Sequence, residues 1–173
     1  MKNLGIDVGG VIISRANDDT DTSFFSDNYL ATTPEIGAFE SINAAFARYD
    51  NIYIVSKCGD NVRRKTLEWF KHHNFYGVTG VKEENVFFCR KRNEKVGICE
   101  QLGITTFVDD RLEILNYMLD KVDNLYLFKP QDSEIDTVVR ENGKNVLSRV
   151  HKVNSWKEFD TLENNYVSNT SAR

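Results

Sequence analysis

Residues 2–12 read KNLGIDVGGVI, an apolar run that meets one carboxylate and then a pair of glycines. Leu4, Ile6 and Val8 fit a central strand of a parallel sheet, because such a strand is covered on both faces and carries a near-continuous apolar run. The two glycines allow the chain to leave the sheet with unusual dihedral angles and bring its backbone close to a ligand. Ligands of open parallel sheets bind outside the carboxyl ends of the strands, so Asp7 is predicted to project into a crevice.

The rest of the chain alternates between strand and helix patterns, which predicts an α/β fold with a parallel sheet. Further strands are predicted near residues 51–55, 85–89, 106–108, 125–128 and 149–153, and helices near residues 33–48, 62–73, 94–102, 111–120, 133–141 and 156–162. Thr33 and Pro34 match an N-cap followed by proline at the first helical position. Ile36, Phe39 and Phe46 are expected on the buried face of that helix.

The length of 173 residues suits one domain, which we place at residues 1–163. Residues 164–173 are mostly polar or small and predict a loose C-terminal tail. A hydrophobic content of 40% with 12% aromatic residues is typical of a globular protein. The net charge of −4 gives no overall attraction to nucleic acids or anionic membranes.

The chain has three cysteines, an odd number without metal-type spacing, and its first residues show no signal-peptide pattern. Reduced thiols in a cytoplasmic protein are the simplest account of this pattern. No apolar run approaches the roughly 20 residues that a membrane-spanning helix requires.

Polar residues also stand at the edges of later elements. Ser56 follows the second predicted strand, Asp109 and Asp110 follow the fourth, and Lys95 opens a helical pattern between them. Taken singly, each has an ordinary explanation: the acidic pair would cap the next helix, Ser56 is common at strand ends, and Lys95 would be a solvated charge. With Asp7 and in this order, over residues 1–128, they resemble the four motifs of the haloacid dehalogenase superfamily.

The resemblance implies a three-layer Rossmann-like parallel sheet with helices on both faces, a short flap after the first strand and no full cap domain. The polar segment at residues 14–33 is then the flap, although a plain surface loop also accounts for it. A site without a cap is open, so it either accepts a phosphorylated macromolecule or is closed by another subunit of an oligomer.

The resemblance also implies roles for these residues in a phosphatase. Phosphoryl transfer needs an in-line nucleophile and positive charge around the phosphoryl oxygens. Asp7 would form an aspartyl-phosphate, and a divalent cation would neutralise the repelling charges. Mg²⁺ favours carboxylate oxygens such as those of Asp7 and the acidic pair. The family pattern implies an inner role for Asp110 and an outer one for Asp109, with the carbonyl of Gly9 as a further ligand. The substrate-binding residues are expected to be Ser56, Lys57, Gly10 and Lys95.

One position departs from the family pattern. The usual general acid stands two residues after the nucleophile, where this chain has Gly9. The loss of a general acid costs roughly 10²–10⁴-fold in rate. Three explanations stay open: a substrate with an easy leaving group, an acid from the flap such as Asp18, Asp19 or Asp21, or a protein that has lost turnover and binds phosphate-bearing partners.

The basic run at residues 90–95, together with Lys57, Arg63 and Arg64, is expected near the mouth of the site. Such a run suits a polyanion, and an ordinary solvated surface accounts for it as well. The leading prediction is therefore a Mg²⁺-dependent phosphatase with a phosphorylated small molecule or macromolecule as its substrate. Nucleic acid is not the favoured partner.

Overall fold

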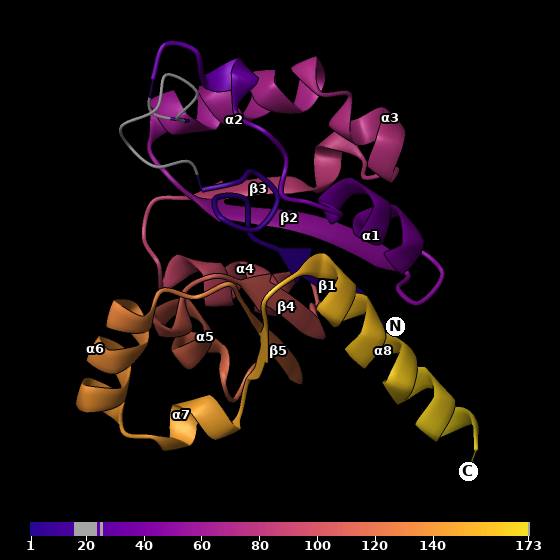
Figure 1. Ribbon diagram of the computed structural model, residues 1–173, viewed down its shortest axis with the longest axis vertical. Coiled ribbons are helices and arrows are strands. Elements are labelled where there is room, and N and C mark those ends of the chain that lie inside the picture. Colours follow the sequence, from indigo (N-terminus) through magenta and orange to yellow (C-terminus); the bar gives the residue numbers. More distant parts are fainter. Residues whose placement is uncertain (16–23, 25, 173) are drawn as a thin grey trace.

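The computed structural model describes residues 1–15, 24 and 26–172, and its centre is a six-stranded parallel sheet (Figure 1). The strand order is β3-β2-β1-β4-β5-β6. The strands are β1 (Asn3–Ile6), β2 (Asn51–Lys57), β3 (Val86–Cys89), β4 (Thr106–Asp109), β5 (Asn124–Phe128) and β6 (His151–Val153). The order reverses between β1 and β4, and this is the point at which open α/β sheets bind ligands.

Helices cover both faces of the sheet (Figure 1), which confirms the predicted three-layer fold. One layer contains α4 (Glu94–Gln101), α5 (Leu112–Met118), α6 (Asp132–Asn142) and α7 (Asn145–Ser148). The other contains α1 (Ala38–Ala45), α2 (Asp60–His72), α3 (Phe75–Thr79) and α8 (Trp156–Ser171). Two short 3₁₀ turns, η1 (Tyr29–Ala31) and η2 (Glu83–Asn85), complete the described elements.

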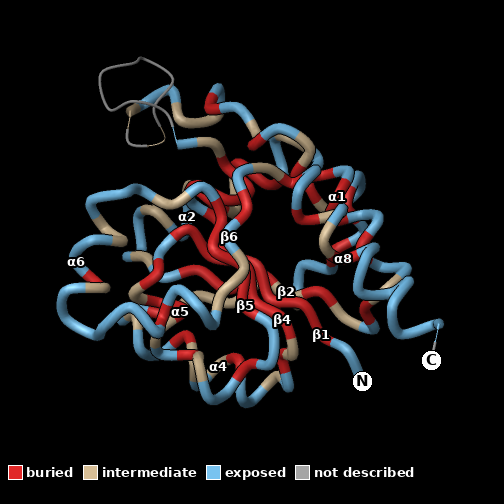
Figure 2. Tube along the Cα trace, turned by 60° about the horizontal axis from the view of Figure 1, so that its bottom comes forward, coloured by how far each residue is buried: buried red, intermediate tan, exposed pale blue. Residues whose placement is uncertain are grey.

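The strands contribute alternate side chains to two separate apolar cores. Phe107 and Leu127 belong to the core under α4 and α5, whereas Val108 and Phe128 belong to the core that contains the side chains of α1, α2 and α8. Because both faces are covered, the strands form the buried centre of the molecule (Figure 2). This double burial explains the continuous apolar runs in the sequence.

The first helix begins later than the sequence predicts. Pro34 pairs with Ile13 in an isolated β-bridge, and α1 starts only after Gly37, which has a left-handed φ of 78°. The amide of Glu35 donates to the carbonyl of Ile12 at 2.8 Å, so this segment is held by the loop after β1 instead of entering the helix. The predictions for Ile36 and Phe46 are wrong, since these residues are 92% and 38% exposed, whereas Phe39 is buried as predicted.

The last helix is longer than predicted. α8 continues to Ser171, so most of the predicted tail at residues 164–173 is helical, although its side chains are exposed. Ser155 caps the first turn by accepting a 3.0 Å hydrogen bond from the amide of Glu158. A helix that has started extends at little cost through polar residues. Tyr166 also contacts His151 of β6 at 3.2 Å, which anchors the added turns.

The connections after β1 and β2 contain no additional domain in the described part of the chain. Before α1 lies the short turn η1, and between β2 and β3 lie α2, α3 and η2. The sequence did not predict α3. The flap prediction falls largely on residues 16–23 and 25, which lie outside the described residues, as do Asp18, Asp19 and Asp21.

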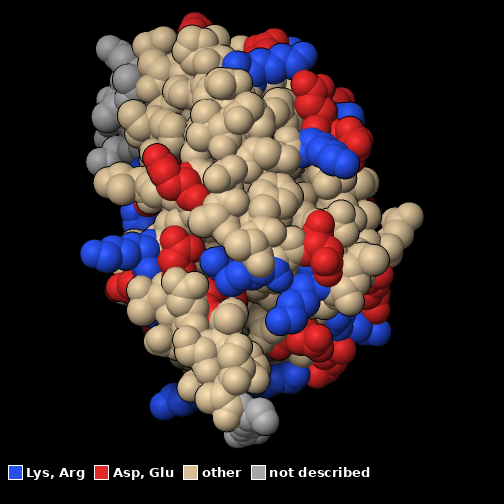
Figure 3. Space-filling model, turned by 90° about the vertical axis from the view of Figure 1, so that its right-hand side faces the viewer, with Lys and Arg blue, Asp and Glu red and all other residues tan. Residues whose placement is uncertain are grey.

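Uncharged side chains cover much of the side formed by α1, α3 and α8 (Figure 3). Phe46, Val78 and Tyr166 are among its partly exposed apolar residues. None of the predicted site residues belongs to these helices. Among the described residues, no helix is both long and apolar enough to cross a membrane.

Candidate active site

The chain turns sharply where β1 ends, and this turn positions Asp7. The amide of Asp7 still donates to Val108 of β4 at 3.0 Å, which keeps the residue at the edge of the sheet. The carbonyl of Val8 then accepts hydrogen bonds from the amides of Ile12 and Ile13 at 2.9 and 3.1 Å. From α8, the indole nitrogen of Trp156 donates to the carbonyl of Val11 at 2.8 Å and fixes the outside of the turn.

A cavity of about 650 Å³ opens at this edge of the sheet. Every residue that the sequence predicts for the site lines it: Asp7, Gly9, Gly10, Ser56, Lys57, Lys95, Asp109 and Asp110. The carboxyl ends of neighbouring parallel strands lie at the same edge, which is why residues so far apart in the sequence meet here. Their positions are observed, and their roles remain predictions.

Lys95 links two of the acids. Its Nζ donates to Asp7 Oδ1 at 2.7 Å and to Asp109 Oδ2 at 2.9 Å, and its side chain is only 3% exposed. Burial by itself lowers the pKa of Lys95, but the carboxylates of Asp109 and Asp7 outweigh it and raise the pKa above its ordinary value. Lys95 is therefore a permanently charged group at the base of α4 and not a solvated surface lysine.

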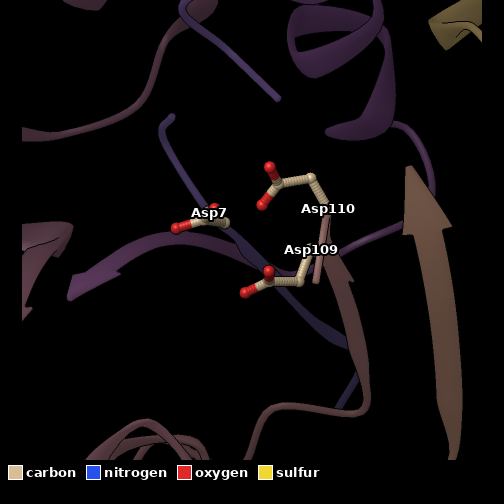
Figure 4. Close-up of side chains that lie close together, drawn as sticks. All are labelled: Asp7, Asp109 and Asp110. Atoms are coloured by element: carbon tan, nitrogen blue, oxygen red, sulfur yellow. The ribbon is translucent and has the colours of Figure 1, made fainter. Parts of the chain in front are cut away.

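Three buried carboxylates lie side by side at the ends of β1 and β4 (Figure 4). Asp7, Asp109 and Asp110 each offer an oxygen atom, and these atoms lie within 4.8 Å of one another. Burial and the neighbouring Asp7 carboxylate raise the pKa of Asp109 to about 6, against the opposing effect of Lys95. Burial, Asp7 and Asp109 raise the pKa of Asp110 to about 8, although Arg15 and Arg111 oppose the shift.

These residues fit a hard divalent cation. Carboxylate oxygens are the ligands that Mg²⁺ prefers, and a site formed by one or two carboxylates is typical of it. Burial, followed by the repulsion between neighbouring carboxylates, raises the pKa values of Asp109 and Asp110, so the ionised cluster is costly without a cation. A bound cation would supply the missing positive charge.

The two glycines of the turn differ in the space around them. Gly10 has a φ of 77°, and a Cβ atom there would lie 2.7 Å from Asp110 Oδ2, so only glycine fits beside the acid cluster. A Cβ atom at Gly9 would meet no atom of the described structure within 4 Å. Position 9, where the resemblance leads us to expect a general acid, therefore has room for a side chain.

The cavity also contains residues that the sequence did not single out, among them Arg15 and Arg111. Arg92, from the basic run at residues 90–95, lines it as well. Arg111 directly follows the acidic pair in the sequence, so its position next to Asp110 could have predicted that it lies at the site. Arg15 gave none, because only the turn after β1 brings it back to form an ion pair with Asp110.

The basic run at residues 90–95 is largely neutralised. Arg90 pairs with Asp60 and Arg92 with Glu113, each at 2.5 Å, and Lys95 is held by the acid cluster. Most of its positive charge is thus already paired within the chain, which argues against a track for a polyanion.

Comparisons with known proteins agree with this architecture. The structure matches D,D-heptose 1.7-bisphosphate phosphatase from B. bronchiseptica, complexed with magnesium and phosphate, with a TM-score of 0.56 and 14% sequence identity over 90% of this chain and 94% of that chain. The chain has a haloacid dehalogenase-like fold. At this level of identity, the likeness shows the haloacid dehalogenase-like fold alone.

Two weaker matches were also found. The cobalt-bound deoxy-D-mannose-octulosonate 8-phosphate phosphatase from Haemophilus influenzae has a TM-score of 0.45 and 15% identity, over 86% of this chain and 88% of that chain. The HAD domain of an effector protein from Legionella pneumophila has a TM-score of 0.44 and 13% identity, over 84% of this chain and 96% of that chain. No protein-family model and no curated protein matches the sequence.

The acid cluster makes stability depend on pH when no metal is bound. The pKa values of Asp109 and Asp110 are raised in the folded state, so their contribution to stability is present below about pH 4 and is lost as pH rises through 6 and 8. In EDTA, we expect the free energy of unfolding to fall between pH 5.5 and 8.5 by about 2 kcal/mol more in the wild type than in Asp110→Asn. Urea unfolding at both pH values measures this difference.

The matched control is Asp136→Asn on α6, which removes an exposed carboxylate away from the cavity. It should follow the wild type. Added Mg²⁺ should reduce the pH dependence of the wild type, because a cation stabilises the ionised carboxylates. Identical pH profiles for the wild type and Asp110→Asn would contradict the prediction.

Proposed function

We propose that this protein is a Mg²⁺-dependent phosphomonoester hydrolase that acts through an aspartyl-phosphate on Asp7. The observation that supports the proposal best is the contact of Lys95 with both Asp7 and Asp109, with Asp110 beside them. This cluster combines a nucleophile, a fixed positive charge and the ligands of a divalent cation in one cavity. The shared fold with a magnesium- and phosphate-bound phosphatase supports the proposal through its architecture alone.

In the proposed reaction, the carboxylate of Asp7 attacks phosphorus and the bond between phosphorus and the leaving oxygen breaks. The leaving group takes up a proton, and water then hydrolyses the acyl-phosphate to release inorganic phosphate and restore Asp7. Lys95 holds Asp7 Oδ1 in place and offsets the charge of the phosphoryl oxygens. Ser56, buried at the end of β2, is proposed to donate a hydrogen bond to one of those oxygens, with Lys57 at the rim.

Asp7, Asp110 and Asp109, with the carbonyl of Gly9, are the groups that would hold Mg²⁺. When bound, the cation supplies positive charge that offsets the repulsion between a carboxylate and a phosphate dianion. The volume of the cavity, about 650 Å³, is in the range typical of small-molecule sites, so a phosphorylated small molecule is the proposed substrate.

A panel of phosphate esters tests the proposal. Acyl phosphates, sugar 1-phosphates, alkyl phosphates and phosphorylated oligonucleotides are incubated with the protein and Mg²⁺, with and without EDTA. Metal-dependent release of phosphate is expected, with a preference for easy leaving groups because Gly9 supplies no acid. A beryllium fluoride adduct on Asp7 that forms only with Mg²⁺ would support the aspartyl-phosphate. A protein that only binds phosphate groups would hydrolyse nothing in the panel.

The space around Gly9 leads to a prediction about the missing acid. Gly9→Asp should raise the hydrolysis of alkyl phosphates by about tenfold or more, because a carboxylic acid there would protonate the leaving alcohol. Acyl phosphates should change little, since their leaving groups need no protonation. Initial rates for both substrate types measure the effect.

Gly9→Asn is the matched control, since it has nearly the same shape and no acid function. It should bring no gain on alkyl phosphates. An equal gain for both variants, or no gain for Gly9→Asp despite normal folding, would show that the acid at this position is not what limits the rate.

A further inference from the structure

The cavity contains more positive charge than a single phosphoryl group requires. Its described lining residues include five cationic side chains, namely Arg15, Lys57, Arg92, Lys95 and Arg111, and three carboxylates. Lys95 forms ion pairs with Asp7 and Asp109, and Arg92 is paired with Glu113 at 2.5 Å. Of the other three, Arg15 pairs with Asp110, whereas Lys57 and Arg111 form no ion pair with another described residue.

Arg15 and Arg111 line the same cavity beside Asp110. Arg15 forms an ion pair with Asp110 Oδ2, and Arg111 directly follows Asp110 in the chain. The side chain of Arg15 is 41% exposed at the cavity wall. Arg111 is exposed as well, and its side chain forms no ion pair or hydrogen bond with another described residue. Its own amide donates to Asp109 Oδ1 at 3.0 Å, which fixes its backbone beside the acid cluster.

The contact between Arg15 and Asp110 competes with the binding of a divalent cation. The guanidinium of Arg15 already pairs with Asp110 Oδ2, so a metal ion that takes this oxygen as a ligand would have to displace it. If Asp110 becomes a metal ligand, Arg15 loses its partner and stays at the wall of the cavity. With a divalent cation bound, its two charges and that of Lys95 balance the three carboxylates. Arg15, Lys57 and Arg111 then supply three positive charges against the two negative charges of a phosphoryl dianion, which leaves one positive charge for a further anionic group.

We propose that Arg15 and Arg111 form a subsite for a second anionic group of the substrate, a phosphate or a carboxylate close to the phosphoryl group that reacts. Arg15 exchanges Asp110 for this group when the metal site is filled. The planar guanidinium forms paired hydrogen bonds with both kinds of anion. The inference rests on the proposed function, and it narrows the substrate to a phosphorylated small molecule with two anionic groups.

Binding of phosphonates tests the subsite without turnover, because their carbon–phosphorus bonds are not cleaved by a phosphomonoesterase. Isothermal titration calorimetry compares methylphosphonate with methylene-, ethylene- and propylene-bisphosphonate and with phosphonoacetate. The titrations are run with the full chain at 0.15 M salt, a concentration at which long-range charge effects are screened, with and without Mg²⁺. The bisphosphonates vary the distance to the second anion, and phosphonoacetate tests a carboxylate.

The wild type with Mg²⁺ is expected to bind at least one dianionic probe about tenfold or more tightly than methylphosphonate. Arg15→Gln and Arg111→Gln should each reduce this preference severalfold and leave the affinity for methylphosphonate nearly unchanged. Arg63→Gln is the control, because Arg63 lies over the ring of Phe88 and does not line the cavity. It should keep the preference of the wild type.

The subsite would be overturned if the wild type bound all probes with equal affinity. It would also be overturned if Arg15→Gln reduced the affinity for every probe, methylphosphonate included, by the same factor. The failure of every phosphonate to bind in the presence of Mg²⁺ would overturn it as well. The proposed hydrolysis is judged separately by the ester panel. The protein could prefer probes with two anionic groups, through Arg15 and Arg111, and still hydrolyse no ester. That result would support the subsite and refute the phosphatase activity.

Discussion

Asp7→Asn is expected to reduce phosphate ester hydrolysis by about 10⁴-fold or more, since an amide cannot replace the carboxylate that attacks phosphorus. The fold should survive for two reasons. Lys95 keeps its hydrogen bond to Asp109, and the substitution removes the negative charge of Asp7, which repels the carboxylate of Asp109. The measurements are the rate of phosphate release with Mg²⁺ and the midpoint of thermal unfolding.

Asp136→Asn serves as the matched control, since it makes the same change at an exposed position of α6. It should retain full activity. A folded Asp7→Asn variant with more than a few per cent of wild-type activity would show that Asp7 is not the nucleophile. Total inactivity of the wild type on the whole panel would favour a phosphate-binding protein instead.

Lys95→Met is expected to produce the largest loss of stability, about 3–5 kcal/mol in the free energy of unfolding, when measured in EDTA. Methionine fills a similar volume, so the loss arises from charge. Without Lys95, three buried carboxylates lie within 4.8 Å of one another, and among the described residues Arg15, at the cavity wall, is the one cationic side chain left in an ion pair with them. Urea unfolding at pH 8 measures the loss.

A second variant separates the charge effect from packing. Lys95→Met combined with Asp109→Asn removes one of the carboxylates that Lys95 neutralises, so it should recover part of the lost stability. If the double variant is as unstable as the single one, the loss is due to packing of the lysine stem. A loss below about 1 kcal/mol for Lys95→Met would mean that the cluster protonates at little cost.

The site was predictable because local patterns mark the ends of buried strands. Asp7, Ser56 and Asp109 each follow an apolar run, and parallel strands deliver their carboxyl ends to one edge of the sheet. Lys95 stands at the start of a helix that returns the chain to this edge. Strand patterns and the order of the polar residues, together with the resemblance to the haloacid dehalogenase superfamily, therefore predicted which side chains meet in the acid cluster.

Helix limits were less predictable, because they depend on contacts with distant segments. Thr33 and Pro34 have the local features of a helix start, yet the bridge between Pro34 and Ile13 holds this segment outside α1. The polar residues after Leu162 show no buried stripe, yet α8 continues through them, with Tyr166 in contact with His151.

The sequence by itself determined the parallel sheet and the acids at its edge, because apolar runs mark the buried strands and Asp7 and Asp109 stand at the ends of such runs. Only the tertiary structure decided that Arg15 meets Asp110 and that Trp156 supports the turn after Asp7. Those contacts join residues about a hundred or more positions apart, and no local periodicity encodes them. They form when both faces of the sheet are covered and the end of the chain packs against its beginning.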